Sequence, residues 1–201
     1  MNITNEDNMK LMSRYEDNYF DLAIVDPPYG INVNKMKLGQ GAKKQKNQKQ
    51  YNDNKIPNKE YFNELFRVSK NQIIWGGNYF NLNATRCILI WDKIQEFSGA
   101  DFEVAWSSFD KVSKAFRMSR VMAYREGTIH PTQKPVKLYE WLLMNYAKEG
   151  DKILDTHLGS GSIAIACHNL GYDLTACELD EEYYKAAMQR IQQHTAQLRI
   201  C

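Results

Sequence analysis

The chain has 201 residues and a formal net charge of +2, with 43% apolar and 25% charged residues. This length supports one domain with a real core, and the composition excludes disordered and fibrous proteins. No apolar run approaches membrane-spanning length and the first residues lack a hydrophobic signal segment, so we expect a cytoplasmic protein without a membrane partner.

The cysteines and histidines give no sign of a cross-linked or metal-binding protein. The four cysteines have no CxxC spacing, and the four histidines are scattered along the chain. These patterns predict reduced structural cysteines and no metal site.

The first predicted strand, Leu22–Val25, runs into Asp26-Pro27-Pro28-Tyr29. Two prolines cannot donate to a sheet ladder, so the strand must stop there. Asp26 then lies at the carboxyl end of a strand, where ligands bind in open α/β sheets. A carboxylate, bare carbonyls and a flat aromatic ring fit a planar molecule that carries an NH2 group. The alternative is a strand-ending Pro-Pro turn.

Residues 32–58 depart from the globular pattern. They carry seven lysines against the single acid Asp53 and almost no apolar residues, so they cannot form a core. A connection this long is usually functional or disordered. Because the segment follows Tyr29, we interpret it as a flexible basic loop that meets a polyanion and orders on binding; a solvated insertion is the alternative. The candidate nucleic-acid-binding residues are Lys43, Lys44, Lys46 and Lys49.

The rest of the chain alternates short apolar runs with helical patterns, which predicts an α/β fold with a mainly parallel sheet. Helices are expected after Asn58, Pro135 and Asp180, which suit helix starts. The further predicted strands are Gln72–Trp75, Cys87–Trp91, Lys152–Leu154 and Leu174–Cys177, with Phe102–Trp106 and Ala115–Tyr124 as weaker candidates for antiparallel edge strands.

A loop before the Pro135 helix is the second candidate site. Thr132 and Lys134 stand at the helix entrance, where a hydroxyl, a charge and backbone N–H groups can hold a carboxylate. A proline-bounded loop before an ordinary helix is the alternative.

A glycine-rich turn follows the strand Lys152–Leu154 and precedes a helical pattern. It contains Gly159 and Gly161, and glycines let a ligand approach the backbone closely at a helix start. The next strand ends at Glu178, 19 positions after Gly159 (178 − 159). An acid at this spacing binds ribose hydroxyls in Rossmann-like folds. Because GxGxxG is incomplete, a nucleoside with a non-phosphate tail fits the turn.

In this order, the motifs resemble those of the S-adenosylmethionine-dependent amino-DNA methyltransferases, the N6-adenine/N4-cytosine family, in the permuted arrangement called the β class. The resemblance runs from about Asp7 to Arg190. It implies a single domain over 1–201 with a seven-stranded Rossmann-like sheet, mostly parallel with an antiparallel edge strand. Residues 94–129 would form a reduced target-recognition region. Small enzymes of this type are common in bacteriophages and prophages, so the resemblance implies such an origin.

The resemblance assigns site residues by matching position. Asp26 and the Pro27 carbonyl would accept hydrogen bonds from the target amine, Pro28 would complete the catalytic motif, and Tyr29 would stack on the flipped base. His157 stands where the family usually has Phe; it could fill the same slot beside the cofactor or have a buried structural role. The S-adenosyl-L-methionine residues would be Asp155, His157, Gly159, Gly161, Ser162 and Glu178, with Thr132 and Lys134 on the methionine part and Asp7 at the adenine amine.

The implied reaction is methyl transfer from S-adenosyl-L-methionine to the exocyclic amine of a flipped base in double-stranded DNA. Asp at the start of the tetrapeptide is typical of adenine-N6 enzymes, so we expect adenine. No cysteine follows a proline, which argues against carbon-5 methylation of cytosine. Three alternatives stay open: cytosine-N4 methylation, RNA methylation, and a non-catalytic nucleic-acid-binding module that keeps the fold. A homodimer and a cognate restriction nuclease are further partners that the resemblance allows.

Overall fold

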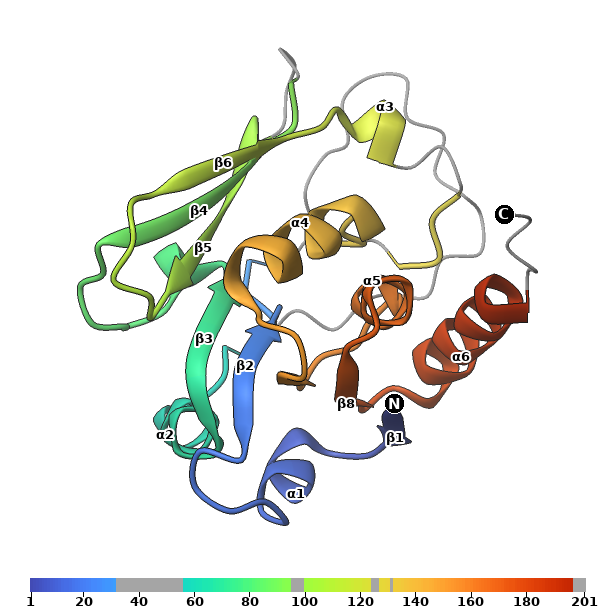
Figure 1. Ribbon diagram of the computed structural model, residues 1–201, viewed down its shortest axis with the longest axis horizontal. Coiled ribbons are helices and arrows are strands. Elements are labelled where there is room, and N and C mark those ends of the chain that lie inside the picture. Colours follow the sequence, from blue (N-terminus) through green and yellow to red (C-terminus); the bar gives the residue numbers. More distant parts are fainter. Residues whose placement is uncertain (32–55, 95–99, 124–126, 131, 197–201) are drawn as a thin grey trace.

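The computed structural model describes residues 1–31, 56–94, 100–123, 127–130 and 132–196. An eight-stranded sheet lies at its centre, in the order β1-β8-β7-β2-β3-β5-β4-β6 (Figure 1). The strands are β1 (Asn2–Asn5), β2 (Phe20–Val25), β3 (Ser69–Trp75), β4 (Cys87–Asp92), β5 (Phe102–Ser107), β6 (Lys114–Arg117), β7 (Lys152–Asp155) and β8 (Asp173–Glu178). The helices are α1 (Asn8–Met12), α2 (Lys59–Val68), α3 (Arg120–Ala123), α4 (Val136–Tyr146), α5 (Ser162–Leu170) and α6 (Glu181–Ala196), with a short 3-10 turn, η2 (Gly77–Tyr79).

The mostly parallel α/β architecture predicted from the sequence is confirmed, but the position of the antiparallel strand differs from the prediction. That strand is β5, and it lies inside the sheet, antiparallel to both β3 and β4. The edge strand β6 runs parallel to β4. The alternating pattern of Phe102–Trp106 shows which side chains share a face, but it does not say which strands lie next to it.

Two further details of the sheet differ from the expectation. The eighth strand is β1, which pairs in parallel with β8; Asn2–Asn5 is too short and polar to give an apolar run. The predicted strand Ala115–Tyr124 ends at Arg117. Helix α3 begins at Arg120 because Ser119 accepts two backbone N–H groups of the first turn. Its side-chain hydroxyl accepts from Met122 at 3.3 Å, and its backbone carbonyl accepts from Ala123 at 2.9 Å.

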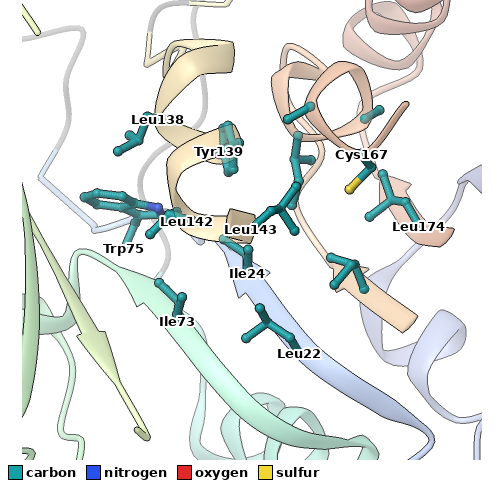
Figure 2. Packing of buried hydrophobic residues seen from close by; sticks show 14 of the residues in the cluster. Leu22, Ile24, Ile73, Trp75, Leu138, Tyr139, Leu142, Leu143, Cys167 and Leu174 are labelled. Atoms are coloured by element: carbon teal, nitrogen blue, oxygen red, sulfur yellow. The ribbon is translucent and has the colours of Figure 1, made fainter. Parts of the chain in front are cut away.

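Apolar side chains cover both faces of the sheet, which explains the unbroken apolar run in β2. Leu22 and Ile24 belong to the cluster that packs with α4 and α5, whereas Ala23 and Val25 belong to the cluster with α1 and α2. Successive strand residues point to opposite faces, so a strand buried on both sides is apolar throughout. Figure 2 shows Leu143 of α4 lying against this first face. Firm packing on both faces fixes where β2 ends and therefore where Asp26 lies.

Predicted caps hold two of the longer helices. The Asn58 side chain accepts the Tyr61 N–H at 3.0 Å at the start of α2. Asp180 does the same for Glu182 at 3.0 Å at the start of α6. Pro135 is the N-cap of α4, one position before the first helical residue. The Asn58 and Asp180 side chains each accept a backbone N–H at a helix start, and Pro135 has no N–H that needs a partner. These helix starts therefore follow from the local sequence.

Some predictions concern residues beyond those described. Most of the basic loop, including Lys43, Lys44, Lys46 and Lys49, lies outside the described residues. The range 94–129 contributes β5 and β6 to the central sheet and also α3. Within the described parts of the chain, no helix has the length and apolarity needed to cross a membrane.

Candidate active site

The carboxyl ends of three neighbouring parallel strands bring the predicted motifs together. Asp26 follows β2, Asp155 ends β7 and Glu178 ends β8, and these strands are adjacent in the sheet. One pocket opens at this edge. Its lining residues are Asp26, His130, Thr132, Gln133, Lys134, Tyr139, His157, Leu158, Gly159, Ser160 and Glu178. The aspartate motif, the proline-bounded loop and the glycine turn therefore share one pocket, as expected at the carboxyl edge of an open α/β sheet.

Both carboxylate oxygens of Asp26 have partners. The Tyr29 hydroxyl donates to Oδ1 and the Lys134 ammonium donates to Oδ2, each at 2.5 Å. Burial raises the pKa of Asp26, and the positive charge of Lys134 opposes that rise. Burial alone would lower the pKa of Lys134, but the carboxylates of Asp26 and Glu103 outweigh it and raise that pKa. Lys134 is therefore an ammonium whose charge is directed at Asp26.

The Tyr29 ring is held between a glycine and other aromatic rings. It stacks on Tyr79 with centroids 5.1 Å apart and planes 13° apart, and it meets Phe80 edge-on at 6.1 Å. A Cβ atom on Gly76 would stand 2.2 Å from the Tyr29 ring. Only glycine leaves room for the ring at this position, and its φ of +70° also favours glycine.

Two side chains of the proline-bounded loop, Lys134 and Thr132, have different partners. Lys134, predicted to hold the methionine part of the cofactor, donates to Asp26 and to Glu103, the latter at 3.1 Å. Thr132 lines the pocket, and its hydroxyl lies 3.1 Å from His130 Nδ1. Both residues lie at the pocket, and their contact with a cofactor stays a prediction.

The glycine turn is tied to the predicted ribose acid. The Gly159 N–H donates to Glu178 Oε2 at 2.8 Å, and Glu178 Oε1 accepts the Asp180 N–H at 3.0 Å. Among the described residues outside its immediate chain neighbours, no atom lies closer than 3.8 Å to where a Gly159 Cβ would stand. The bare α-carbon of Gly159 therefore opens onto the pocket, and the Glu178 carboxylate is fixed beside it.

Four predicted cofactor residues do not line the pocket. Gly161 packs on α6, where an added Cβ would meet Ile191 at 3.0 Å. The Ser162 hydroxyl accepts from Arg190 at 2.9 Å. Asp7 is exposed and caps α1 through the Met9 N–H at 2.9 Å. Asp155 is 2% exposed and accepts the His157 N–H at 2.9 Å. Gly161, Ser162 and Asp155 thus hold the glycine turn in place without lining the pocket.

His157 is held on both sides of its ring. Nδ1 lies 2.9 Å from the Thr156 hydroxyl, and Nε2 lies 3.1 Å from the Asn8 side-chain nitrogen. Burial lowers the pKa of His157 to about 4, so the ring is neutral near pH 7. His157 also lines the pocket. His157 therefore links the glycine turn to α1 and forms part of the pocket wall, while its contact with a cofactor stays a prediction.

Sequence reasoning missed several residues around the aspartate motif. Among them are Tyr79, which stacks on Tyr29, Glu103, which pairs with Lys134, and Lys93, which pairs with Glu103. A signal for Glu103 was present. It lies two positions before Ala105, which is fully buried, so the alternation of β5 places a glutamate on a buried face. A carboxylate there requires a cationic partner, and the partner could not be read from local sequence.

The DNA methylase family model N6_N4_Mtase matches residues 43–189, more than half of the chain. The chain belongs to this DNA methylase family. Among curated members, the type II methyltransferase M.HpaI of Haemophilus parainfluenzae is 37% identical over 62 residues, which cover 31% of this chain and 20% of that protein. The type II methyltransferase M2.DpnII of Streptococcus pneumoniae is 40% identical over 63 residues, covering 31% and 24%. The matched segment thus spans about a quarter or less of either relative.

Solved structures show the same fold over nearly the whole chain. The M1.HpyAVI–SAM complex superposes with a TM-score of 0.61 at 21% identity, covering 94% of this chain and 98% of that one. The PvuII cytosine-N4-specific DNA methyltransferase gives 0.58 at 13% identity, covering 96% and 89%. These likenesses confirm the Rossmann-like methyltransferase fold of the chain.

The buried Asp155 predicts a pH-dependent stability. Burial raises its pKa from the usual 3.8 to about 8. Between about pH 4 and pH 8 the folded chain keeps a proton that the unfolded chain has lost, so this group makes the free energy of unfolding fall as pH rises, by up to ~1.4 kcal/mol per pH unit. Asp155→Asn, which cannot titrate, should therefore gain stability over the wild type progressively from about pH 5 to about pH 8. Urea unfolding of both proteins across this range measures the difference; a pH-independent difference would contradict the assignment.

Proposed function

We propose that this DNA methylase transfers a methyl group from S-adenosyl-L-methionine to the exocyclic amine of a base flipped out of double-stranded DNA, with adenine N6 as the acceptor. The observation that carries this proposal is the single pocket that joins Asp26 to Gly159 and Glu178. One end offers an acceptor for an amine, and the other offers an open glycine turn beside a fixed carboxylate.

The residues of the glycine turn fit the proposed cofactor. Glu178 can accept further hydrogen bonds from ribose hydroxyls, because a carboxylate has about four lone-pair sites and its two backbone partners use only part of them. The neutral ring of His157 adds no positive charge that would repel a sulfonium. The structural relative M1.HpyAVI was solved as a SAM complex. When bound here, the cofactor would supply an electrophilic methyl group.

Asp26 and Tyr29 would act on the acceptor. The amine of adenine is a poor nucleophile because its lone pair is delocalised into the ring. If the target amine displaces the Tyr29 hydroxyl from Asp26 Oδ1 and also donates to the Pro27 carbonyl, those two hydrogen bonds favour a tetrahedral nitrogen with a directed lone pair. The Tyr29 ring would then be free to stack on the base. The two prolines fix the backbone that aims both acceptors.

The choice of adenine N6 as the acceptor rests on the aspartate, Asp26, at the start of the tetrapeptide. Cytosine N4 is the closest competitor, since the PvuII structural relative is described as cytosine-N4-specific. A homodimer, a cognate nuclease and DNA contacts of Lys43, Lys44, Lys46 and Lys49 stay predictions from the sequence.

Product analysis tests the proposal directly. The protein is incubated with methyl-labelled cofactor and either mixed-sequence duplex DNA or RNA, and the nucleosides are separated. We expect label in N6-methyldeoxyadenosine. Label in N4-methyldeoxycytidine would overturn the choice of base, label in RNA alone would overturn the choice of DNA, and no label in either would favour the non-catalytic module.

A further inference from the structure

Four charged side chains form an alternating chain that ends at Asp26. The Lys134 ammonium donates to Asp26 Oδ2 at 2.5 Å and lies 3.1 Å from Glu103 Oε2, and Lys93 lies 2.8 Å from Glu103 Oε1. The side chains of Lys134 and Lys93 are 1% and 9% exposed, and that of Glu103 is 25% exposed. With two acids and two lysines, the chain is neutral as a whole.

Such a cluster is poorly explained by stability alone. Removing two charges from water costs several kcal/mol per ion, and apolar replacements of buried ion pairs are often neutral or stabilising. The members come from four separate places: the end of β2, the loop before α4, strand β5 and the residue after β4. Their convergence on the proposed amine acceptor points to a role in the reaction.

The three N–H donors of Lys134 show what Glu103 contributes. They face Asp26, Glu103 and the Tyr29 hydroxyl, the last at 3.3 Å. An ammonium has three donors and no acceptor, so these contacts determine its orientation. When a target amine takes the place of the Tyr29 hydroxyl, Glu103 remains as the second carboxylate that holds Lys134, and the Trp75 ring lies 5.1 Å from the ammonium.

We propose that Glu103 is a positioning residue of the amine site: it fixes Lys134 on Asp26 Oδ2 and so leaves Oδ1 for the target amine. Lys93 supports it by neutralising Glu103, because Asp26, Lys134 and Glu103 without Lys93 would carry a buried net charge of −1. The internal place of β5 in the sheet makes this possible, since β5 pairs with β4 and sets Glu103 opposite Trp91, two residues before Lys93. The inference rests on the proposed function and assigns part of its machinery.

The test is Glu103→Gln, which keeps the size of the side chain and removes its charge. A hydrogen bond to a charged group corresponds to roughly tenfold to 100-fold in a rate, so we expect kcat to fall by about that factor. Cofactor affinity, measured by calorimetric titration, should stay within about twofold, because Glu103 is not a lining residue of the pocket. In a Lys134→Met background, Glu103→Gln should cost less than about twofold more, because Glu103 acts through Lys134.

Glu140→Gln is the matched control. Glu140 is a buried carboxylate of α4 that is likewise paired with a lysine, Lys137 at 2.7 Å, and accepts from Asn169 at 2.8 Å, but neither partner belongs to this chain of charges. Its kcat should equal that of the wild type. If Glu103→Gln does not fold, Lys93→Gln breaks the same chain one step further out and should lower kcat with the same non-additivity.

Each result decides the matter. Unchanged kcat, a loss that persists in full in the Lys134→Met background, or an equal loss in Glu140→Gln would overturn the role of Glu103 while wild-type transfer still supports the proposed function. A loss of cofactor affinity instead of kcat would place Lys134 on the cofactor and would also overturn it. An inert wild-type protein would overturn the proposed function and this inference together.

Discussion

Asp26→Ala is expected to lower methyl transfer by about 10²- to 10³-fold, the scale seen when a key electrostatic contact to the reacting group is removed. The variant loses the carboxylate that would accept the target amine. It also removes the partner that Lys134, 1% exposed, has at 2.5 Å and leaves Glu103, at 3.1 Å, as its remaining carboxylate. Breaking a buried ion pair by removing one member costs ~3–5 kcal/mol of stability, so the assay must be run where the variant is shown to be folded by circular dichroism.

Asp26→Asn separates chemistry from stability. Asparagine keeps the shape and one acceptor oxygen but loses the charge that binds Lys134, so transfer should fall to an intermediate level. Cofactor binding by calorimetry should be largely intact in both variants, because the Gly159–Glu178 contact at 2.8 Å does not involve Asp26. Wild-type turnover in either folded variant would refute the role of Asp26 as the amine acceptor.

The convergence of the site was predictable because it depends on strand direction. Asp26 and Glu178 each follow an apolar run, and the carboxyl ends of parallel strands meet at one edge of a sheet. The caps at Asn58 and Asp180 were predictable because a cap involves only neighbouring residues. Local chemistry and one topological rule therefore locate the pocket.

The ion pairs between side chains at the pocket could not be predicted in the same way. Lys134 lies 108 positions from Asp26 in the chain, and its place between two carboxylates depends on β5 being inserted between β3 and β4. Strand periodicity indicates which residues share a face, but the neighbours of a strand are set by long-range packing. The resemblance implied a cofactor contact for Lys134, which stays a prediction, but it gave no sign of the ion pairs that Lys134 makes with Asp26 and Glu103.

Gly76→Ala is expected to impair both stability and transfer. A Cβ there would lie 2.2 Å from the Tyr29 ring, so the ring must leave its stack on Tyr79 and the position from which it would stack on the base. The backbone strain of an L-residue at positive φ costs ~1–2 kcal/mol, and the overpacking adds ~1–3 kcal/mol. Displacing an aligned group by about 1 Å can cost about 100-fold in rate, so we expect kcat to fall by about that factor.

Gly171→Ala isolates the contact from the strain. Gly171 has φ +77°, close to the +70° of Gly76, but no atom in the described parts of the chain lies within 4 Å of where its Cβ would stand. This control should lose only the ~1–2 kcal/mol of backbone strain and keep wild-type kcat. Urea unfolding and initial rates of both variants give the comparison. If Gly76→Ala matched Gly171→Ala in both measurements, displacement of the Tyr29 ring would have affected neither stability nor kcat. The position of Tyr29 between Gly76 and Tyr79 would then be irrelevant to holding the base.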